Sequence, residues 1–322
     1  YSTARNDGGG IGGDNVNIET KNLLIDIKVP ETTSAFRLGL QWFADNYDST
    51  LFDTDMAGIR YEGEFGLLDL TAGWYKLIEG NVDVADDVNL WGLQLGFEPS
   101  DTFDFGVDYY YYQNQGSQEY ATFFGTADIT AVLNFKAGGG DWTANREDMD
   151  LHYIGGHAAY QFGSFALSGW LNTNFGTVEN INNNTAAPAL TEDLDVQGYA
   201  ARLTLDSTFG NVKLRLGGAY FSGDDDLTDG DASFIVTPTA TEGFAFYNDG
   251  FMIFTPDVSW TSVGQYGFAM MDAAFAGYGL ASAVLTGDYK PEFDQNFRLR
   301  GGVGYFASLE DTLAPNDPRT DR

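Results

Sequence analysis

Nonpolar and polar residues alternate along this chain in short runs, so that nonpolar side chains recur at every second position. Segment 102–113 shows the pattern most clearly. One parity holds Phe103, Phe105, Val107, Tyr109 and Tyr111, whereas the other holds Asp104, Gly106 and Asp108. A period of two predicts a β-strand. A strand with one apolar and one charged face is typical of a transmembrane β-barrel wall, which has hydrocarbon outside and water inside.

The same pattern predicts twelve strands, arranged as six pairs. Their ranges are 16–29 with 34–45, 56–65 with 67–77, 87–97 with 102–113, 151–162 with 164–175, 194–209 with 211–222, and 278–290 with 296–309. Short joints rich in Gly, Pro, Asp and Asn connect the members of each pair, as in β-hairpins. Longer connections separate the pairs, at 46–55, 78–86, 114–150, 176–193 and 223–277. Outer-membrane barrels combine short periplasmic turns with long extracellular loops in this way.

Aromatic residues gather at both ends of the apolar faces. Beside the short turns lie Phe36, Phe65, Phe97, Phe103, Phe162, Phe165, Phe209, Tyr289 and Phe297, and toward the long connections lie Trp42, Trp74, Trp91, Tyr111, Tyr220 and Tyr305. The two interfaces of a bilayer select two such rows. A soluble β-sandwich or a surface adhesin, the main alternative, also alternates but gains nothing from aromatic residues at both rims.

We therefore predict an all-β fold, a transmembrane antiparallel up-and-down β-barrel that forms a single domain over 1–322. Segment 268–285 is apolar enough for a membrane helix to be an alternative there, although its length is marginal. The mean hydropathy of −0.23 does not suggest a helical membrane protein. The chain starts without a Met, a basic region or an apolar leader, which is the pattern of a mature exported protein.

Composition narrows the range of partners and cofactors. The chain has no cysteine, which argues against thiolate metal sites and is compatible with an outer membrane. Its formal net charge of −31 disfavours nucleic acid as a partner, because the phosphate backbone would repel it. Outer-membrane lipid, lipopolysaccharide, and small solutes or ions are the expected partners.

Charged residues of the predicted strands lie on the polar parity and are expected to line the pore. The basic ones are Arg37, Arg60, Arg202, Lys213, Arg215, Arg298 and Arg300, and the acidic ones are Glu62, Glu64, Asp104, Asp108, Asp206 and Asp288. One interpretation is a solvated lumen with balanced charges. The other is a constriction in which a basic wall faces an acidic loop and the resulting field orients polar solutes. Its best anchors would be Lys213 with Arg215 and Arg298 with Arg300.

Two long connections contain apolar residues that a fully solvated loop would not need, 114–150 and 223–277. Each is predicted either to fold into the bore as a constriction or plug, or to pack above the rim. The acidic run in the second loop offers Asp224, Asp226, Asp229 and Asp231 as a weak metal candidate. It lacks the spacing of an EF-hand, so no cofactor is expected beyond Ca²⁺ or Mg²⁺ ions at the acidic loops, where they would bridge to lipopolysaccharide.

Catalytic residues are scarce. Of the two histidines, His152 has the apolar parity, whereas His157 shares the polar parity with Ser168 on the next strand. Neither of these two strands offers an acidic residue to orient His157, and Asn172 is the amide available. A nucleophilic hydrolase needs such an orienting group, so the chain is not expected to be an enzyme.

Several short segments, 15–22, 40–45, 52–59, 276–280 and 302–306, are similar to those of Gram-negative outer-membrane porins. More narrowly, the chain resembles the porins of metal- and sulfur-respiring bacteria and the alginate-export-type barrels. The resemblance implies passive transport and no catalytic residues. It also implies a further strand pair before Tyr1 and another after Arg322, which gives 14–18 strands in the full protein, and by analogy a homotrimer.

The expected function is therefore that of an outer-membrane porin, in which small hydrophilic solutes or ions diffuse through a water-filled lumen narrowed by inward loops. One alternative is a substrate-specific channel for an anionic solute that uses the inward Arg/Lys ladder. Another is a structural barrel that forms a sheath around a redox or surface partner. Acidic rim loops are expected to favour cations at low salt.

Overall fold

The computed structural model describes residues 9–10, 17–18, 22–78, 87–115, 148–179, 193–225, 231–236, 279–292 and 297–310. Every regular element in these ranges is a strand: β1 (Gly9–Gly10), β2 (Asn17–Ile18), β3 (Leu23–Lys28), β4 (Ala35–Ala44), β5 (Asp53–Phe65), β6 (Leu68–Ile78), β7 (Val88–Ser100), β8 (Phe103–Gln115), β9 (Asp148–Phe162), β10 (Phe165–Val178), β11 (Leu194–Phe209), β12 (Val212–Phe221), β13 (Asp231–Ala232), β14 (Leu280–Tyr289) and β15 (Leu299–Ser308). Within the same ranges, no helix is long and apolar enough to cross a membrane.

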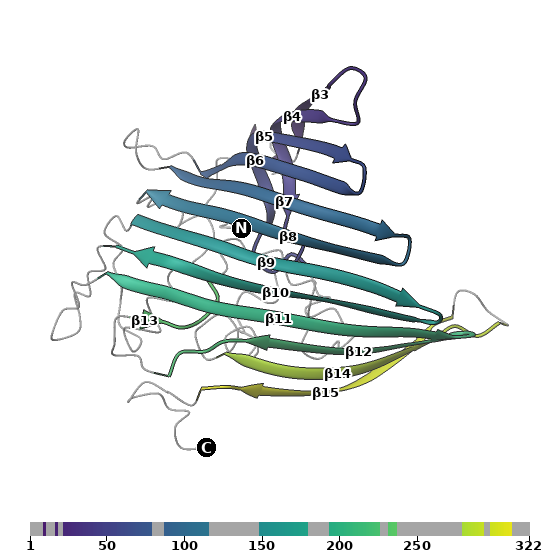
Figure 1. The fold of residues 1–322 in the computed structure, drawn as a ribbon. Helices are drawn as coiled ribbons and strands as arrows, with labels where there is room; N and C mark the ends of the chain where they lie inside the picture. Colours follow the sequence, from purple (N-terminus) through teal and green to yellow (C-terminus); the bar gives the residue numbers. More distant parts are fainter. Residues whose placement is uncertain are drawn as a thin grey trace.

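The twelve long strands form one antiparallel sheet in chain order, from β3 to β15 (Figure 1). The short strand β13 pairs in parallel with β11 beside this path. The twelve predicted strands and their up-and-down order are thus confirmed, but the first predicted range, 16–29, is wrong at its start, because Asn17–Ile18 (β2) pairs with β1 in a separate two-stranded sheet and β3 begins at Leu23. The helical alternative for 268–285 is wrong for residues 280–285, because they belong to strand β14, which begins at Leu280. Residues 268–278 lie outside the described residues.

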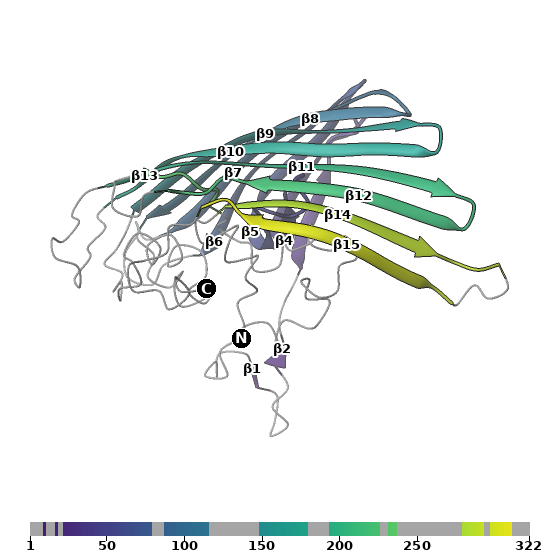
Figure 2. The same ribbon diagram turned by 90° about the horizontal axis from the view of Figure 1, so that it is seen from below.

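The sheet bends into an arch, as Figure 2 shows. Its two edges are β3 and β15, and among the described strands neither edge pairs with the other. The curvature gives the sheet an inner and an outer face, and the antiparallel register carries one parity of residues to each face along the whole arch.

Tight turns close the hairpins at one end, which lies on the right in Figure 1. Three of these turns have two residues and begin with Gly66, Gly163 or Gly210. The φ angles of these glycines are 71°, 61° and 57°. A positive φ at the first turn position is characteristic of type II′ turns, whose twist matches the strands, and glycine adopts it without strain.

The outer face is apolar and uncovered by the described part of the chain. Leu171 and Leu203, in the middle of β10 and β11, are each 58% exposed, and Val303 of β15 is 66% exposed. They lie on the parity that the sequence assigned to hydrocarbon. Because exposed apolar patches of this extent are rare on soluble monomers, the outer face requires a nonpolar environment.

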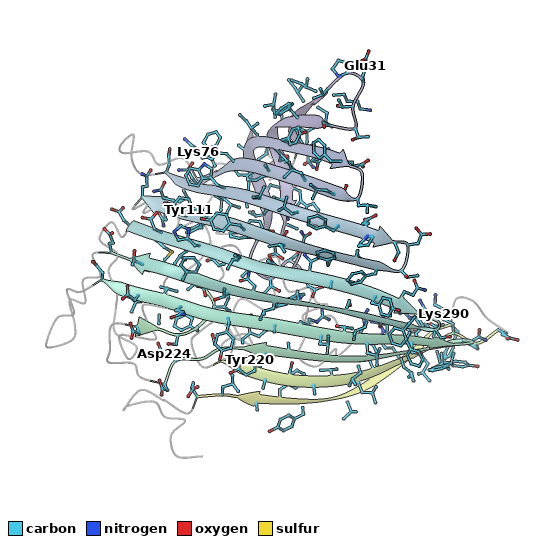
Figure 3. The ribbon with its side chains drawn as sticks, viewed as in Figure 1. Glu31, Lys76, Tyr111, Tyr220, Asp224 and Lys290 are labelled. Atoms are coloured by element: carbon cyan, nitrogen blue, oxygen red, sulfur yellow. The ribbon has the colours of Figure 1, made fainter. Side chains whose placement is uncertain are left out.

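Aromatic rings follow both rims of the outer face. On the turn side, ring contacts run through Phe97, Phe105, Phe103, Tyr160, Phe162, Phe165 and Phe209. On the loop side, stacked rings run through Trp91, Tyr111, His152 and Phe175. Figure 3 shows the two ends of the sheet, with Glu31 and Lys290 at the turn end and Tyr111 and Tyr220 toward the loop end.

The distance between the two aromatic rows matches a membrane. In β8, Tyr111 follows Phe103 by eight residues, which is about 26 Å along a strand at roughly 3.3 Å per residue. A strand tilt of about 40° reduces this to a height of about 20 Å, close to the roughly 25 Å apolar band of outer-membrane barrels.

The inner face is divided into two halves. Its turn half carries charged and polar side chains. Its loop half is instead covered by a buried hydrophobic cluster, whose large members are Phe43, Tyr47, Leu51, Phe52, Met56, Tyr75, Leu90, Tyr110, Tyr112, Met149, Leu151, Tyr153, Trp170, Phe221 and Phe234. Most of these residues, such as Tyr75, Leu90 and Tyr110, are inner-facing strand residues, so the expectation of a polar, solvated inner face is wrong for this half of the sheet.

Candidate functional site

Ion pairs between neighbouring strands line the turn half of the inner face. Arg215 of β12 lies opposite Asp206 of β11 and holds it through two parallel contacts, Nε–Oδ1 at 2.7 Å and Nη2–Oδ2 at 3.0 Å. Asp288 of β14 contacts Arg298, and Arg300 Nε lies 3.6 Å from the same carboxylate. The acids that face the predicted basic anchors therefore belong to the same wall.

A second group of paired charges lies near the β3 edge. Arg37 and Arg60 are directly opposite in the register of β4 and β5, an arrangement of like charges that by itself destabilises a sheet. Each has an acidic neighbour: Arg37 Nε donates to Asp26 Oδ1 at 2.8 Å, and Arg60 Nη2 lies 2.6 Å from Glu62 Oε1. The two acids relieve the repulsion between the guanidinium groups.

The remaining predicted pore residues give the two flanks of the arch different charge. Glu64 lies opposite Asp69 between β5 and β6, and Asp104 is an exposed inner residue of β8. On the other flank, Lys213 of β12 lies opposite Asp288. Acidic residues thus prevail on the inner side of β5–β8, and basic residues prevail on β12–β15.

The short connection between β4 and β5 turns inward and lies on the inner face. The Asp45 carboxylate accepts backbone N–H groups of Tyr47 at 2.7 Å, Leu51 at 2.6 Å and Phe52 at 2.7 Å, which closes the loop on itself. Burial raises the pKa of the Asp45 carboxyl to about 7, and these N–H donors act against that rise. We call residues 45–52 the inward loop.

Polar contacts fasten the inward loop to strands β8, β10 and β11. Asn46 Nδ2 donates to Asp108 Oδ1 at 3.0 Å. Asp48 Oδ2 accepts the Trp170 indole N–H at 2.6 Å and Arg202 Nη1 at 2.5 Å. Two predicted pore residues, Asp108 and Arg202, are therefore occupied in holding this loop.

Aromatic contacts complete the attachment. The Tyr47 ring lies between Tyr110 and Trp170, with centroids 6.4 and 5.8 Å away. Phe52 packs edge-on against Tyr110 and Tyr153, at 5.2 and 5.4 Å. Through its polar and aromatic contacts together, the inward loop covers the inner face of β8–β11 at the loop half.

The inward loop is a candidate functional element that sequence reasoning missed. The two long loops considered as constrictions lie mostly outside the described residues, at 116–147, 226–230 and 237–278. A described piece of the second, 231–236, packs on the inner face, where Tyr153 Oη donates to the Val236 carbonyl at 3.0 Å. The same signal, apolar residues inside a polar connection, was present at 45–52 in Tyr47, Leu51 and Phe52.

His157 has an acidic neighbour that the sequence did not indicate. Its Nδ1 lies 3.2 Å from Asp108 Oδ2, on the adjacent strand β8. The ring lies over Gly106, where a Cβ atom would approach the imidazole to 2.4 Å. Ser168 belongs to β10, on the other side of β9, so the imidazole is turned away from the strand that carries the hydroxyl.

The weak metal candidate is only partly within the described chain. Asp224 is buried and accepts the Ser233 backbone N–H at 3.2 Å, while Asp231 is exposed in β13. Asp226 and Asp229 lie outside the described residues. Among the residues that are described, no three His, Cys, Asp or Glu side chains come together as metal ligands would.

Comparison with known proteins adds little beyond the strand architecture. No family model and no curated protein matches this chain. Similar solved structures include OmpT, an outer membrane protein of Vibrio cholerae (14% identity, TM-score 0.34, 66% of this chain and 59% of that one), and OccAB4 of Acinetobacter baumannii (13%, 0.41, 85% and 56%). Another is the toluene transporter TodX of P. putida (12%, 0.25, 80% and 68%).

The chain spans less than two thirds of the length of the first two of these structures, 59% and 56%. At such TM-scores and identities, the similarities carry no information about what passes through or binds to this protein.

Proposed function

We propose that this protein is an outer-membrane β-barrel channel through which small hydrophilic solutes or ions diffuse passively. The observation that carries the proposal is the contrast between the two faces of the sheet. The outer face is apolar between two aromatic rows about 20 Å apart in height, close to the apolar band of an outer-membrane barrel. The inner face has ion pairs and exposed carboxylates, which are stable next to water and costly next to lipid.

The inner residues suggest how such a channel would select solutes. Cross-strand pairing neutralises much of the basic set, because Arg215, Arg298 and Arg37 each contact an Asp. The excess of acid on β5–β8 and of base on β12–β15 would place a transverse field across the lumen, with both signs on the walls. This supports diffusion of mixed polar solutes more than transport along an unpaired ladder of Arg and Lys.

The inward loop would form the constriction. It is held by Asp48, Asn46 and two aromatic rings, so the passage would be narrowed in the resting channel. A role as a sheath around a redox or surface partner is the competing proposal. The buried cluster counts against it, because it already fills the loop half of the inner face.

Electrical recording from the purified protein in a planar lipid bilayer tests the proposal. Stepwise conductance in potassium chloride is the expected result, with larger steps when the inward loop is shortened between Asn46 and Leu51. Protein that inserts without conductance, in both the native and the shortened form, would favour the sheath instead.

A further inference from the structure

Arg202 and Trp170 form a two-donor anion site on the inner wall. They are directly opposite in the register of β10 and β11, so the indole N–H and the guanidinium emerge side by side. Both donate to the same oxygen, Asp48 Oδ2, at 2.6 and 2.5 Å. The Arg202 side chain is 8% exposed, and a guanidinium so deeply buried requires an anionic partner.

The carboxylate in this site belongs to Asp48, whose backbone has an unfavourable conformation. Asp48 and Ser49 have φ angles of 57° and 58°, in the left-handed region, which Asp adopts occasionally and Ser seldom. Strain of this kind persists only where surrounding contacts impose it. The Asp48 side chain is also 38% exposed, so the site opens toward the space enclosed by the arch.

These observations indicate that β10 and β11 carry the binding site and that the inward loop supplies the Asp48 carboxylate as an internal ligand. Two donors on rigid neighbouring strands are preorganised, whereas their acceptor sits on a loop that must be held in an unfavourable conformation. A carboxylate that is free in the lumen presents the same oxygen atoms without the backbone strain.

We propose that the Trp170–Arg202 pair is a binding site for small carboxylates, in which Asp48 is the resident ligand and a solute carboxylate competes with it. The inference rests on the proposed function only in that the solute reaches the site through the lumen. Displacement of Asp48 would release the inward loop, so a carboxylate would also widen the passage that it enters.

Asp48→Gly creates a direct test, because it removes a side chain that has the shape of acetate and leaves a residue that tolerates positive φ. In detergent micelles, acetate is expected to raise the unfolding temperature of this variant in a saturable way. Sodium chloride of equal ionic strength and neutral acetamide are the controls. Adding Arg202→Gln to the variant is expected to abolish the effect of acetate.

The native chain should need at least about twice as much acetate as Asp48→Gly, because Asp48 occupies the site in most molecules and the apparent affinity falls in proportion to the fraction of sites that are free. Stabilisation of Asp48→Gly that acetamide or sodium chloride reproduces would overturn the proposal. Equal half-saturating concentrations in the native and variant chains would overturn it too.

A second measurement on the native chain decides the matter if Asp48→Gly does not fold. Tyr47 and Phe52 are buried when the inward loop is docked, so chymotrypsin cleaves after them only when it is released. Acetate is expected to accelerate these two cleavages in the native chain at least threefold, whereas acetamide is not. Cleavage that is insensitive to acetate would refute competition with Asp48. Neither the unfolding temperature nor the cleavage rate depends on conductance. Failure of the channel proposal can therefore be distinguished from failure of this one.

Discussion

Single side chains determine where the inward loop lies. Asp45 organises the loop from within through three backbone N–H groups, and Asp48 and Asn46 attach it to the wall. Phe52 is fully buried among aromatic rings. The polar residues therefore define the position of the loop, and the aromatic residues supply most of the area removed from water.

Asp45 is expected to make stability depend on pH. Since its pKa is raised to about 7 from 3.8, the folded chain keeps the proton to higher pH than the unfolded chain. Through this group, stability falls as pH rises from about 4 to about 7 and levels off above that. Asp45→Asn loses one acceptor oxygen and should unfold at a lower temperature, but with a flatter pH dependence between about pH 5.5 and 7. An unchanged slope in thermal unfolding would contradict this assignment.

Phe52→Ala tests whether the inner cluster is dry and packed. Its ring is 0% exposed and contacts Phe43, Tyr110 and Tyr153. Its removal should lower the free energy of unfolding by about 3–5 kcal/mol, as for other buried aromatic residues. Phe65→Ala, on the exposed outer face, is the matched control and should cost clearly less. Equal losses in urea unfolding would mean that the inward loop is not docked.

At the scale of elements, close backbone approach positions the described segment 231–236. A Cβ on Gly198 of β11 would lie 2.1 Å from the Phe234 carbonyl carbon, so only glycine allows the segment to lie on this strand. Strand parity explains on which face of the sheet these segments lie. Inner residues of β9–β11 contact the inward loop and segment 231–236, whereas their outer residues are exposed.

Gly198→Ala should displace segment 231–236 and destabilise the protein by about 1–3 kcal/mol, the usual range for overpacking. The chain has no native cysteine, so Ile235→Cys gives a unique thiol at a buried position. A water-soluble maleimide is expected to label it faster in the Gly198→Ala background. Gly301→Ala, where a Cβ meets nothing within 4 Å, is the control and should leave the labelling rate unchanged.

A charge on the outer face of β11 distinguishes lipid from water as its surroundings. Leu203 lies between the aromatic rims, and Leu203→Lys should cost about 2–4 kcal/mol if it faces the bilayer midplane. Gln161→Lys, at an exposed inner position of β9, should fold into lipid vesicles with native yield. Indistinguishable yields for the two variants would argue for a solvated outer face.

For the whole molecule, the net charge of −31 predicts salt-dependent selectivity. At about 0.1 M salt the Debye length is roughly 10 Å, and at about 1 M it is roughly 3 Å. The cation preference obtained from reversal potentials should therefore decrease toward unity as salt rises. A ratio that stays constant over this range would place the selective charges in a desolvated constriction instead of at solvated rims.

The sequence alone was sufficient for the twelve strands, their order and the face each residue occupies. These properties depend on local chemistry: a period of two, turn glycines such as Gly163, and aromatic residues at strand ends. A strand's parity is visible within a few residues, so the outward position of Leu203 needed no knowledge of the neighbouring strands.

Only the tertiary structure decided which groups meet on the inner face. Arg202 and Asp48 are 154 positions apart, and Asp108 meets His157 across a strand pair. Such contacts depend on the register of every strand pair between the two residues and on the curvature of the sheet. No local pattern in the sequence encodes these properties. The alternating pattern therefore predicts which strand residues face inward. Only the arch of the folded sheet shows that the inward loop reaches Arg202.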